Sequence, residues 1–215
     1  MTTRIILSAG MPRSGSTWLF NAVRLLLLKA NFTITAKWID DFIESDLSNA
    51  DVVLIKLHDF NLDWVGQADF VVYSYRDIRD VLASIERKFC HTPTLELAND
   101  LIDIDYKWKK VANFVMRYES LDSKKESILN ELAKQLGLHF NKKDFTDIQN
   151  ELDNMKYSDS EYKNEIYNLI NLLHVDHITL GGYGTWKGQV DDCLISEIEQ
   201  HCLQWFIDFD YKISI

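Results

Sequence analysis

The sequence predicts an α/β fold in three layers, with a central, mainly parallel β-sheet between two layers of helices. Three observations lead to this prediction. Short apolar runs of strand length alternate with longer segments of helical periodicity. These short runs are apolar almost throughout, which is typical of parallel strands covered on both faces. No repeat, low-complexity tract or linker divides the 215 residues, so we expect a single domain over 1–215.

The N-terminal half supplies most of the expected sheet. A buried strand over 4–8 leads through a tight turn into a helix over 16–30. Further elements are expected as core strands over 51–57 and 70–75, helices over 79–88 and 97–113, and a short strand over 114–118. Ligands of parallel sheets bind at the carboxyl ends of the strands, so the residues that follow these runs are the first candidates for a site.

The C-terminal half is expected to be largely helical. Ser123 and Glu126 have the spacing of a capping box, which predicts a helix that starts there and ends at Gly137 as a left-handed C-cap. The remaining elements are helices over 142–155, 157–174 and 194–207, and a loop over 177–188 that holds half of the eight glycines.

Composition narrows the class of protein. The net charge of −10 argues against nucleic acid as a partner, because nucleic-acid binders carry a basic surface. The three cysteines are too few and too widely spaced for a disulfide framework or a zinc site. The longest leucine run, 25–28, is far shorter than the roughly 18 apolar residues of a membrane span. We therefore expect a cytoplasmic protein with no membrane span and no targeting segment.

The turn between the first strand and the first helix is the strongest candidate for a binding site. Such a turn directs backbone N–H groups and the positive end of the helix dipole at one point. A cation and three hydroxyls surround Gly15 there: Arg13, Ser14, Ser16 and Thr17. The spacing from Gly10 to Thr17 matches the P-loop pattern, except that Ser16 stands in the lysine position. This predicts a P-loop NTPase-like fold that binds a phosphate or sulfate group, whereas the missing lysine disfavours an NTPase.

Lys56 and His58 close the strand over 51–57 and point to the same side of it, because side chains alternate along a strand. Beside a reaction centre, His58 would be a general base and Lys56 would stabilise charge on a leaving group. A solvated strand end explains the pair equally well, so position alone leaves both interpretations open.

Two later segments also suit an anion. Arg76 follows the strand over 70–75, and Ser84 lies about two turns into the next helix, a combination suited to a phosphate monoester. Arg79 and Asp80, by contrast, are expected to pair locally at the start of that helix.

The second such segment is the glycine-rich stretch from Gly181 to Gly188, which contains Trp186 and Lys187. Its backbone N–H groups could surround an anion, and a plain surface loop fits it at least as well.

These segments, in this order, resemble the sulfotransferases that use 3′-phosphoadenosine 5′-phosphosulfate (PAPS), over roughly residues 5–187. The family's first loop, Pro-Lys-Ser-Gly-Thr-Thr-Trp, is similar to Pro12-Arg13-Ser14-Gly15-Ser16-Thr17-Trp18. The resemblance implies that this loop binds the 5′-phosphosulfate, that Arg13 contacts the bridging oxygen and that Trp18 stacks on the adenine. Lys56-Leu57-His58 looks like the family's Lys-Thr-His, which implies that His58 is the catalytic base.

The family's 3′-phosphate segment, Tyr-x-x-Arg-Asn-Pro-Arg-Asp-x-x-x-Ser, is similar to the stretch from Tyr73 to Ser84, where Asp-Ile replaces Asn-Pro. This implies that Arg76 and Ser84 bind the 3′-phosphate. Tyr118 begins a segment similar to the family's Tyr-Glu-Asp-Leu, which implies that its ring lies near the adenine.

The family's last segment, Arg-Lys-Gly-x-x-Gly-x-Trp-Lys, is matched only in part. Gly181, Trp186 and Lys187 match it and are expected to contact the cofactor, but Thr179 and Leu180 replace the Arg-Lys pair that holds the 3′-phosphate. His177, Lys187 or backbone N–H groups could take over that role, or the affinity could be lower.

The resemblance implies metal-free transfer of a sulfuryl group from PAPS to a hydroxyl or amine of a small-molecule acceptor, with His58, Lys56 and Arg13 as catalytic residues. Two alternatives stay open. A P-loop kinase of a metabolite or nucleotide would need a magnesium ligand, for which Asp59 is the best candidate. A non-catalytic nucleotide-binding protein would explain the loss of the Arg-Lys pair.

Overall fold

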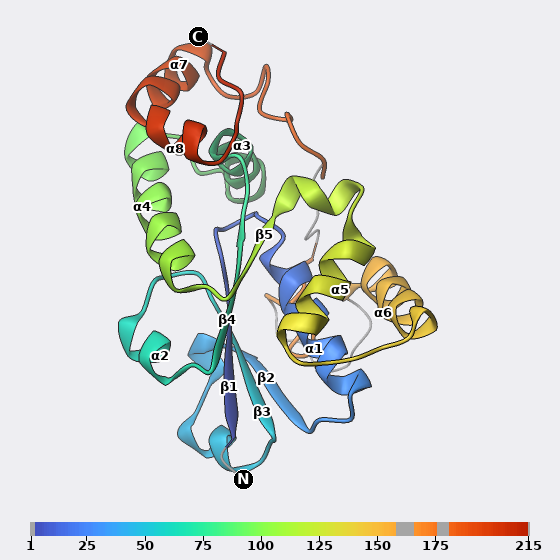
Figure 1. Ribbon diagram of the computed structural model, residues 1–215. Coiled ribbons are helices and arrows are strands. Elements are labelled where there is room, and N and C mark those ends of the chain that lie inside the picture. The colour runs from blue at the N-terminus through green and yellow to red at the C-terminus, as the bar shows by residue number, and fades with distance from the viewer. Residues whose placement is uncertain (1–2, 158–165, 176–180, 215) are drawn as a thin grey trace.

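The computed structural model describes residues 3–157, 166–175 and 181–214. Its centre is a five-stranded parallel sheet in the order β2-β3-β1-β4-β5, with helices on both faces (Figure 1). The strands are β1 Arg4–Gly10, β2 Ile34–Trp38, β3 Val52–Leu57, β4 Phe70–Tyr75 and β5 Phe114–Arg117. The predicted α/β class and parallel sheet are confirmed. The sequence prediction missed β2, whose side chains are all only partly buried and include Thr35 and Lys37.

Two helical layers enclose the sheet (Figure 1). The helices are α1 Ser16–Lys29, α2 Leu62–Gln67, α3 Ile78–Phe89, α4 Leu95–Val111, α5 Lys125–Gln135, α6 Lys142–Asn154, α7 Asp192–His201 and α8 Leu203–Asp208. Alternation along the strands decides which layer each side chain meets. Ile6 packs in one cluster with α1, α5 and α6, whereas its neighbour Leu7 packs in another with Trp108 of α4.

The start of α5 corrects one prediction. Ser123 is not its N-cap: the residues Tyr118–Asp122 form a 3-10 helix, and Ser123 is the C-cap of that short helix. The α-helix begins at Lys125 without a side-chain cap. Its predicted end is confirmed, because Gly137 has a φ of +77° and the N–H of Leu138 donates to the carbonyl of Ala133 at 2.8 Å.

Two other helical predictions were wrong. In the described part of 157–174, the chain forms turns and an isolated bridge between Tyr167 and His174 rather than a helix. The expected helix over 194–207 is two helices, α7 and α8, separated at Cys202. The break lets Trp205 and Phe206 of α8 turn into a buried cluster with residues of α3 and α4. Among the described residues, no helix combines the length and the apolar content that a membrane crossing requires.

Candidate active site

The turn between β1 and α1 has the backbone geometry of an anion-binding loop. Gly15 is the N-cap of α1 with a φ of +75°, and a Cβ there would lie 3.0 Å from the ring of Tyr118. Arg13 also has a positive φ, 63°. Within the described part of the chain, no side chain caps α1. The N–H groups of its first turn are therefore available to a ligand.

The hydroxyls of this loop have different partners. The buried Ser14 Oγ lies 2.6 Å from the carbonyl oxygen of Met11 and 2.8 Å from Ser74 Oγ of β4. Ser14 therefore braces the loop against the sheet through its side chain, a role that the sequence did not suggest. Thr17 Oγ1 faces β3 and accepts a hydrogen bond of 2.6 Å from Lys56 Nζ of that strand.

Lys56 and His58 come to the carboxyl end of β3, directly beside this loop. His58 Nδ1 lies 2.6 Å from the carbonyl oxygen of Gly10. A carbonyl only accepts, so Nδ1 carries the proton and Nε2 is the acceptor nitrogen of the imidazole. The Trp38 ring lies 5.3 Å from the His58 ring and within 5.6 Å of Lys56 Nζ.

Burial and mutual repulsion perturb both groups. Burial and, secondly, the charge of Arg13 lower the pKa of Lys56 to about 7. Burial and the charge of Lys56 lower the pKa of His58 to about 3. The imidazole is therefore neutral at physiological pH, which is the protonation state of a general base.

Arg76, which is only 3% exposed, joins three parts of the predicted site. Its Nη1 donates to the carbonyl of Arg13 at 3.1 Å, its Nη2 donates to the carbonyl of Gly182 at 3.0 Å, and its guanidinium lies 4.3 Å from the centre of the Tyr118 ring. Arg13 Nε in turn donates to Ser84 Oγ at 2.9 Å. These five residues, far apart in the sequence, therefore form one cluster.

The expected local pairing of Arg79 with Asp80 was wrong. Arg79 forms buried ion pairs with Asp77, at 2.6 Å, and with Glu199 of α7. Asp80 accepts hydrogen bonds from the N–H groups of Gly184 and Trp186 and from the hydroxyl of Thr185, at 2.7 to 3.0 Å. Both residues therefore hold the C-terminal segment on α3.

The glycine-rich stretch turns sharply, with φ values of 63° at Gly181, 71° at Gly182 and 71° at Gly184. Trp186 is 7% exposed and packs with Ala83, Val190 and Ile195, so the structure gives it a packing role. Lys187 is exposed. The replaced pair at 179–180 and residue 177 lie outside the described residues.

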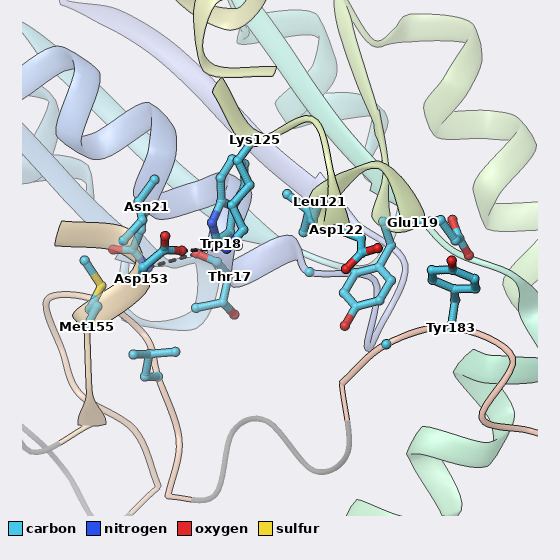
Figure 2. A pocket seen from close by; sticks show the side chains of 15 residues that line it. Thr17, Trp18, Asn21, Glu119, Leu121, Asp122, Lys125, Asp153, Met155 and Tyr183 are labelled. Carbon is cyan, nitrogen blue, oxygen red and sulfur yellow. Dashed lines mark hydrogen bonds and ion pairs between the residues drawn. The ribbon is translucent and has the colours of Figure 1, made fainter. Parts of the chain in front are cut away.

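A cavity of about 310 Å³ opens beside the loop (Figure 2). Trp18 and Asn21 of α1 lie on one side of it, and Tyr183 lies across from them. Lys125 and Asp153 form an ion pair of 2.6 Å at this pocket. The other lining residues include Tyr118, Leu121, Asp122, Leu152, Met155 and Leu173. Sequence reasoning identified Trp18 and Tyr118 here, and missed the residues that α5 and α6 supply.

His174 is a second imidazole that the sequence did not single out. Its ring packs against that of Tyr167 at 5.8 Å. Burial and the charge of Lys56 lower its pKa, and Arg13 contributes in the same direction. Among the described residues, no group of three or more His, Cys, Asp or Glu side chains is placed to hold a metal ion.

No protein-family model and no curated protein sequence matches the chain. Solved structures do. Mouse sulfotransferase SULT7A1 complexed with PAP is 16% identical, with a TM-score of 0.66, covering 96% of this chain and 89% of that one. Retinol dehydratase, in a complex with androsterone and the inactive cofactor PAP, is 15% identical, with a TM-score of 0.60, covering 100% of this chain and 83% of the other. The complex of retinol dehydratase with retinol and PAP gives a TM-score of 0.58. The chain therefore has the fold of the PAPS-dependent sulfotransferases.

Proposed function

We propose that this protein transfers a sulfuryl group from PAPS to a hydroxyl or amine of a small-molecule acceptor. The observation that carries the proposal is the convergence of Arg13, Lys56 and His58 at the N-terminus of α1. Arg13 belongs to the turn itself, Lys56 donates to Thr17 of α1, and His58 is bound to the carbonyl of Gly10. A cation pair and an oriented neutral imidazole beside an anion-binding turn match the needs of sulfuryl transfer.

His58 is the general base in this proposal. Its Nδ1–H bond to Gly10 fixes the ring and leaves Nε2 to accept the proton of the acceptor hydroxyl or amine. The acceptor oxygen or nitrogen then bonds to sulfur while the bond from sulfur to the bridging oxygen breaks. The released phosphate oxygen keeps the electron pair of that bond.

Arg13 and Lys56 stabilise the charge that develops on this oxygen. The pKa of Lys56, about 7, lies near neutrality in the unliganded protein. A bound phosphosulfate adds negative charge nearby, which favours the protonated ammonium. Positioning and electrostatic stabilisation of this kind provide most of the catalysis in the related transfer of phosphoryl groups.

Several of the remaining predicted residues would hold the nucleotide in this proposal. Backbone N–H groups from Gly15 to Thr17 would hold the 5′-phosphate. Trp18 and Tyr118 line the cavity in which an adenine would lie, and Arg76 with Ser84 would take the 3′-phosphate. Retinol dehydratase has been crystallised with androsterone and with retinol, both with PAP. The Trp38 ring beside His58 suits an acceptor with an apolar body of that kind.

A P-loop kinase is the alternative of a different enzyme class. The lysine position of its loop is Ser16, whose side chain is a hydroxyl. Lys56 approaches the turn from β3 instead, and its Nζ donates a hydrogen bond to Thr17 Oγ1. In a P-loop the hydroxyl at the position of Thr17 binds magnesium. Binding of Mg-ATP distinguishes the two functions directly.

The test is calorimetric titration with 3′-phosphoadenosine 5′-phosphate (PAP), with ADP and Mg-ATP in parallel. We expect PAP to bind at least about tenfold more tightly than ADP, because only PAP brings a 3′-phosphate to Arg76. A preference for Mg-ATP would favour the kinase, and binding of none of the three would refute both assignments.

Acceptors are then screened with PAPS, and His58→Gln is compared with the parent protein. We expect turnover to fall by about a hundredfold or more, while PAP affinity changes less than about threefold. Turnover that survives within about threefold would show that His58 is not the base. PAP binding without turnover on any acceptor would favour the non-catalytic alternative.

A further inference from the structure

Arg87 belongs to the cation cluster around Ser84, although it lies outside every motif recognised in the sequence. It follows Ser84 by one turn of α3, so both side chains lie on the same face of the helix. Its Nη2 donates to Thr185 Oγ1 at 3.3 Å, and its Nη1 donates to Gln189 Oε1. Both partners are neutral, and Arg87 forms no salt bridge among the described residues.

The cluster also contains donors that lack an acceptor. The Nε atoms of Arg76 and Arg87 are buried and, as far as the chain is described, have no hydrogen-bond partner. Arg76 as a whole is 3% exposed. Buried guanidinium N–H groups are normally satisfied, because leaving them unpaired is costly. Two such atoms in neighbouring arginines indicate that an acceptor outside the protein completes the site.

The charges of the cluster indicate the kind of acceptor. After burial, the main influence on the pKa of Arg13 is the charge of Arg76, and Arg87 lowers that pKa further. Burial and Arg76 likewise lower the pKa of Arg87, against the smaller opposing effects of Asp80 and Glu86. Asp80 lies 3.9 Å from Arg76 Nη2 and offsets one of these charges, while its oxygens also accept hydrogen bonds from residues 184–186. The three guanidinium groups thus leave an excess of positive charge, which suits a doubly charged phosphate monoester.

We propose that Arg87 is a direct ligand of the nucleotide 3′-phosphate and supplies the cation that Thr179 and Leu180 do not. The inference rests on the proposed function, since it assigns one more residue to the nucleotide site. Arg87 would exchange its neutral partners, Thr185 and Gln189, for a charge-assisted, two-pronged contact with the phosphate. Because Arg87 lies on α3 one turn after Ser84, its guanidinium stays close to the other proposed phosphate ligands.

The experiment compares PAP with AMP, which differ only in the 3′-phosphate, by calorimetry on the full chain. The parent protein is expected to prefer PAP. Arg87→Met is expected to lose about tenfold in PAP affinity while AMP affinity stays within about twofold. Arg87→Lys is expected to lie between them, because an ammonium keeps the charge without the planar fork. Lys110→Met, which removes one charge from an exposed position on α4, controls for net charge and is expected to match the parent.

The outcomes separate the inference from the proposed function. If the parent prefers PAP and Arg87→Met keeps that preference in full, Arg87 is not a ligand and the proposed function still stands. If the parent does not distinguish PAP from AMP, both fail together. Circular dichroism and thermal melting check that each variant is folded. If Arg87→Met is unfolded, the PAP and AMP affinities of Arg87→Lys are compared with those of the parent instead.

Discussion

The burial of Lys56 makes the stability of this protein depend on pH in a calculable way. The pKa of Lys56 is 10.5 when unperturbed and about 7 in the folded chain. Between these values the unfolded chain holds a proton that the folded chain has released, so stability rises as the pH rises through this window and is lowest below pH 7. Below pH 7 both states hold the proton, so only the two units from pH 7 to pH 9 contribute to a step from pH 6 to pH 9; at about 1.4 kcal/mol per unit they correspond to about 3 kcal/mol.

Lys56→Met removes this contribution, because methionine does not titrate and fills a similar volume. Urea unfolding followed by circular dichroism at pH 6 and pH 9 measures it. We expect the gain in unfolding free energy between the two pH values to be smaller in Lys56→Met than in the parent, by about 3 kcal/mol. Other titrating groups, such as Lys109 with its pKa of about 8, contribute equally to both proteins and cancel.

Lys107→Met is the matched control, since it removes an exposed lysine from α4. It is expected to keep the full pH dependence of the parent. If Lys56→Met shows the same gain as the parent, Lys56 is charged in the folded protein at pH 9, and the reasoning about its burial beside Arg13 is wrong.

Three further predictions concern the candidate active site and the ion pairs around it. With PAPS saturating, the pH profile of kcat/KM for the acceptor should stay level from pH 7 down to pH 5, because the pKa of His58 is about 3, and should fall only above pH 7 as Lys56 loses its proton; an acid limb near pH 6.5 would contradict this. Gly15→Ala should lower stability by about 1–2 kcal/mol, because a φ of +75° disfavours any side chain, and an unchanged melting temperature would count against the turn geometry. Arg79→Met should cost about 3–5 kcal/mol, because it leaves Asp77 and Glu199 buried without their partner; in thermal melts, Lys110→Met, which removes an exposed cation of α4, is the comparison.

Continuous apolar runs made most of the sheet predictable. β1, β3 and β4 are buried on both faces, so their sequences differ clearly from those of amphipathic helices. β2 lies at the edge of the sheet, and its alternation of apolar and polar residues is typical of a half-buried strand, which a search for continuous apolar runs does not find. Ser123 shows the limit of local motifs: the 3-10 helix before it sets the backbone geometry there, whatever the side chains at 123 and 126 favour.

The candidate site was predictable where its residues follow strands. Arg13, His58 and Arg76 each lie just beyond the end of a parallel strand, and strand order brings them together. Arg87 was not predictable, because it lies in a charged helical stretch typical of a solvated surface. Asp153 and His174 reach the site through packing of distant segments, and packing of that kind leaves no signal in local sequence.

The three hydrogen bonds from residues 184–186 to Asp80, with the bond from Arg76 to Gly182, have a consequence for the thermodynamics of binding. Ordering a residue of flexible backbone costs about 1–2 kcal/mol in conformational entropy. Because these bonds join groups of the chain itself, they order residues 182–186 independently of a nucleotide, which reduces the entropic penalty of binding. In Asp80→Ala, residues 182–186 would have to be ordered when the nucleotide binds. Calorimetry would then show a more unfavourable binding entropy than in the parent protein.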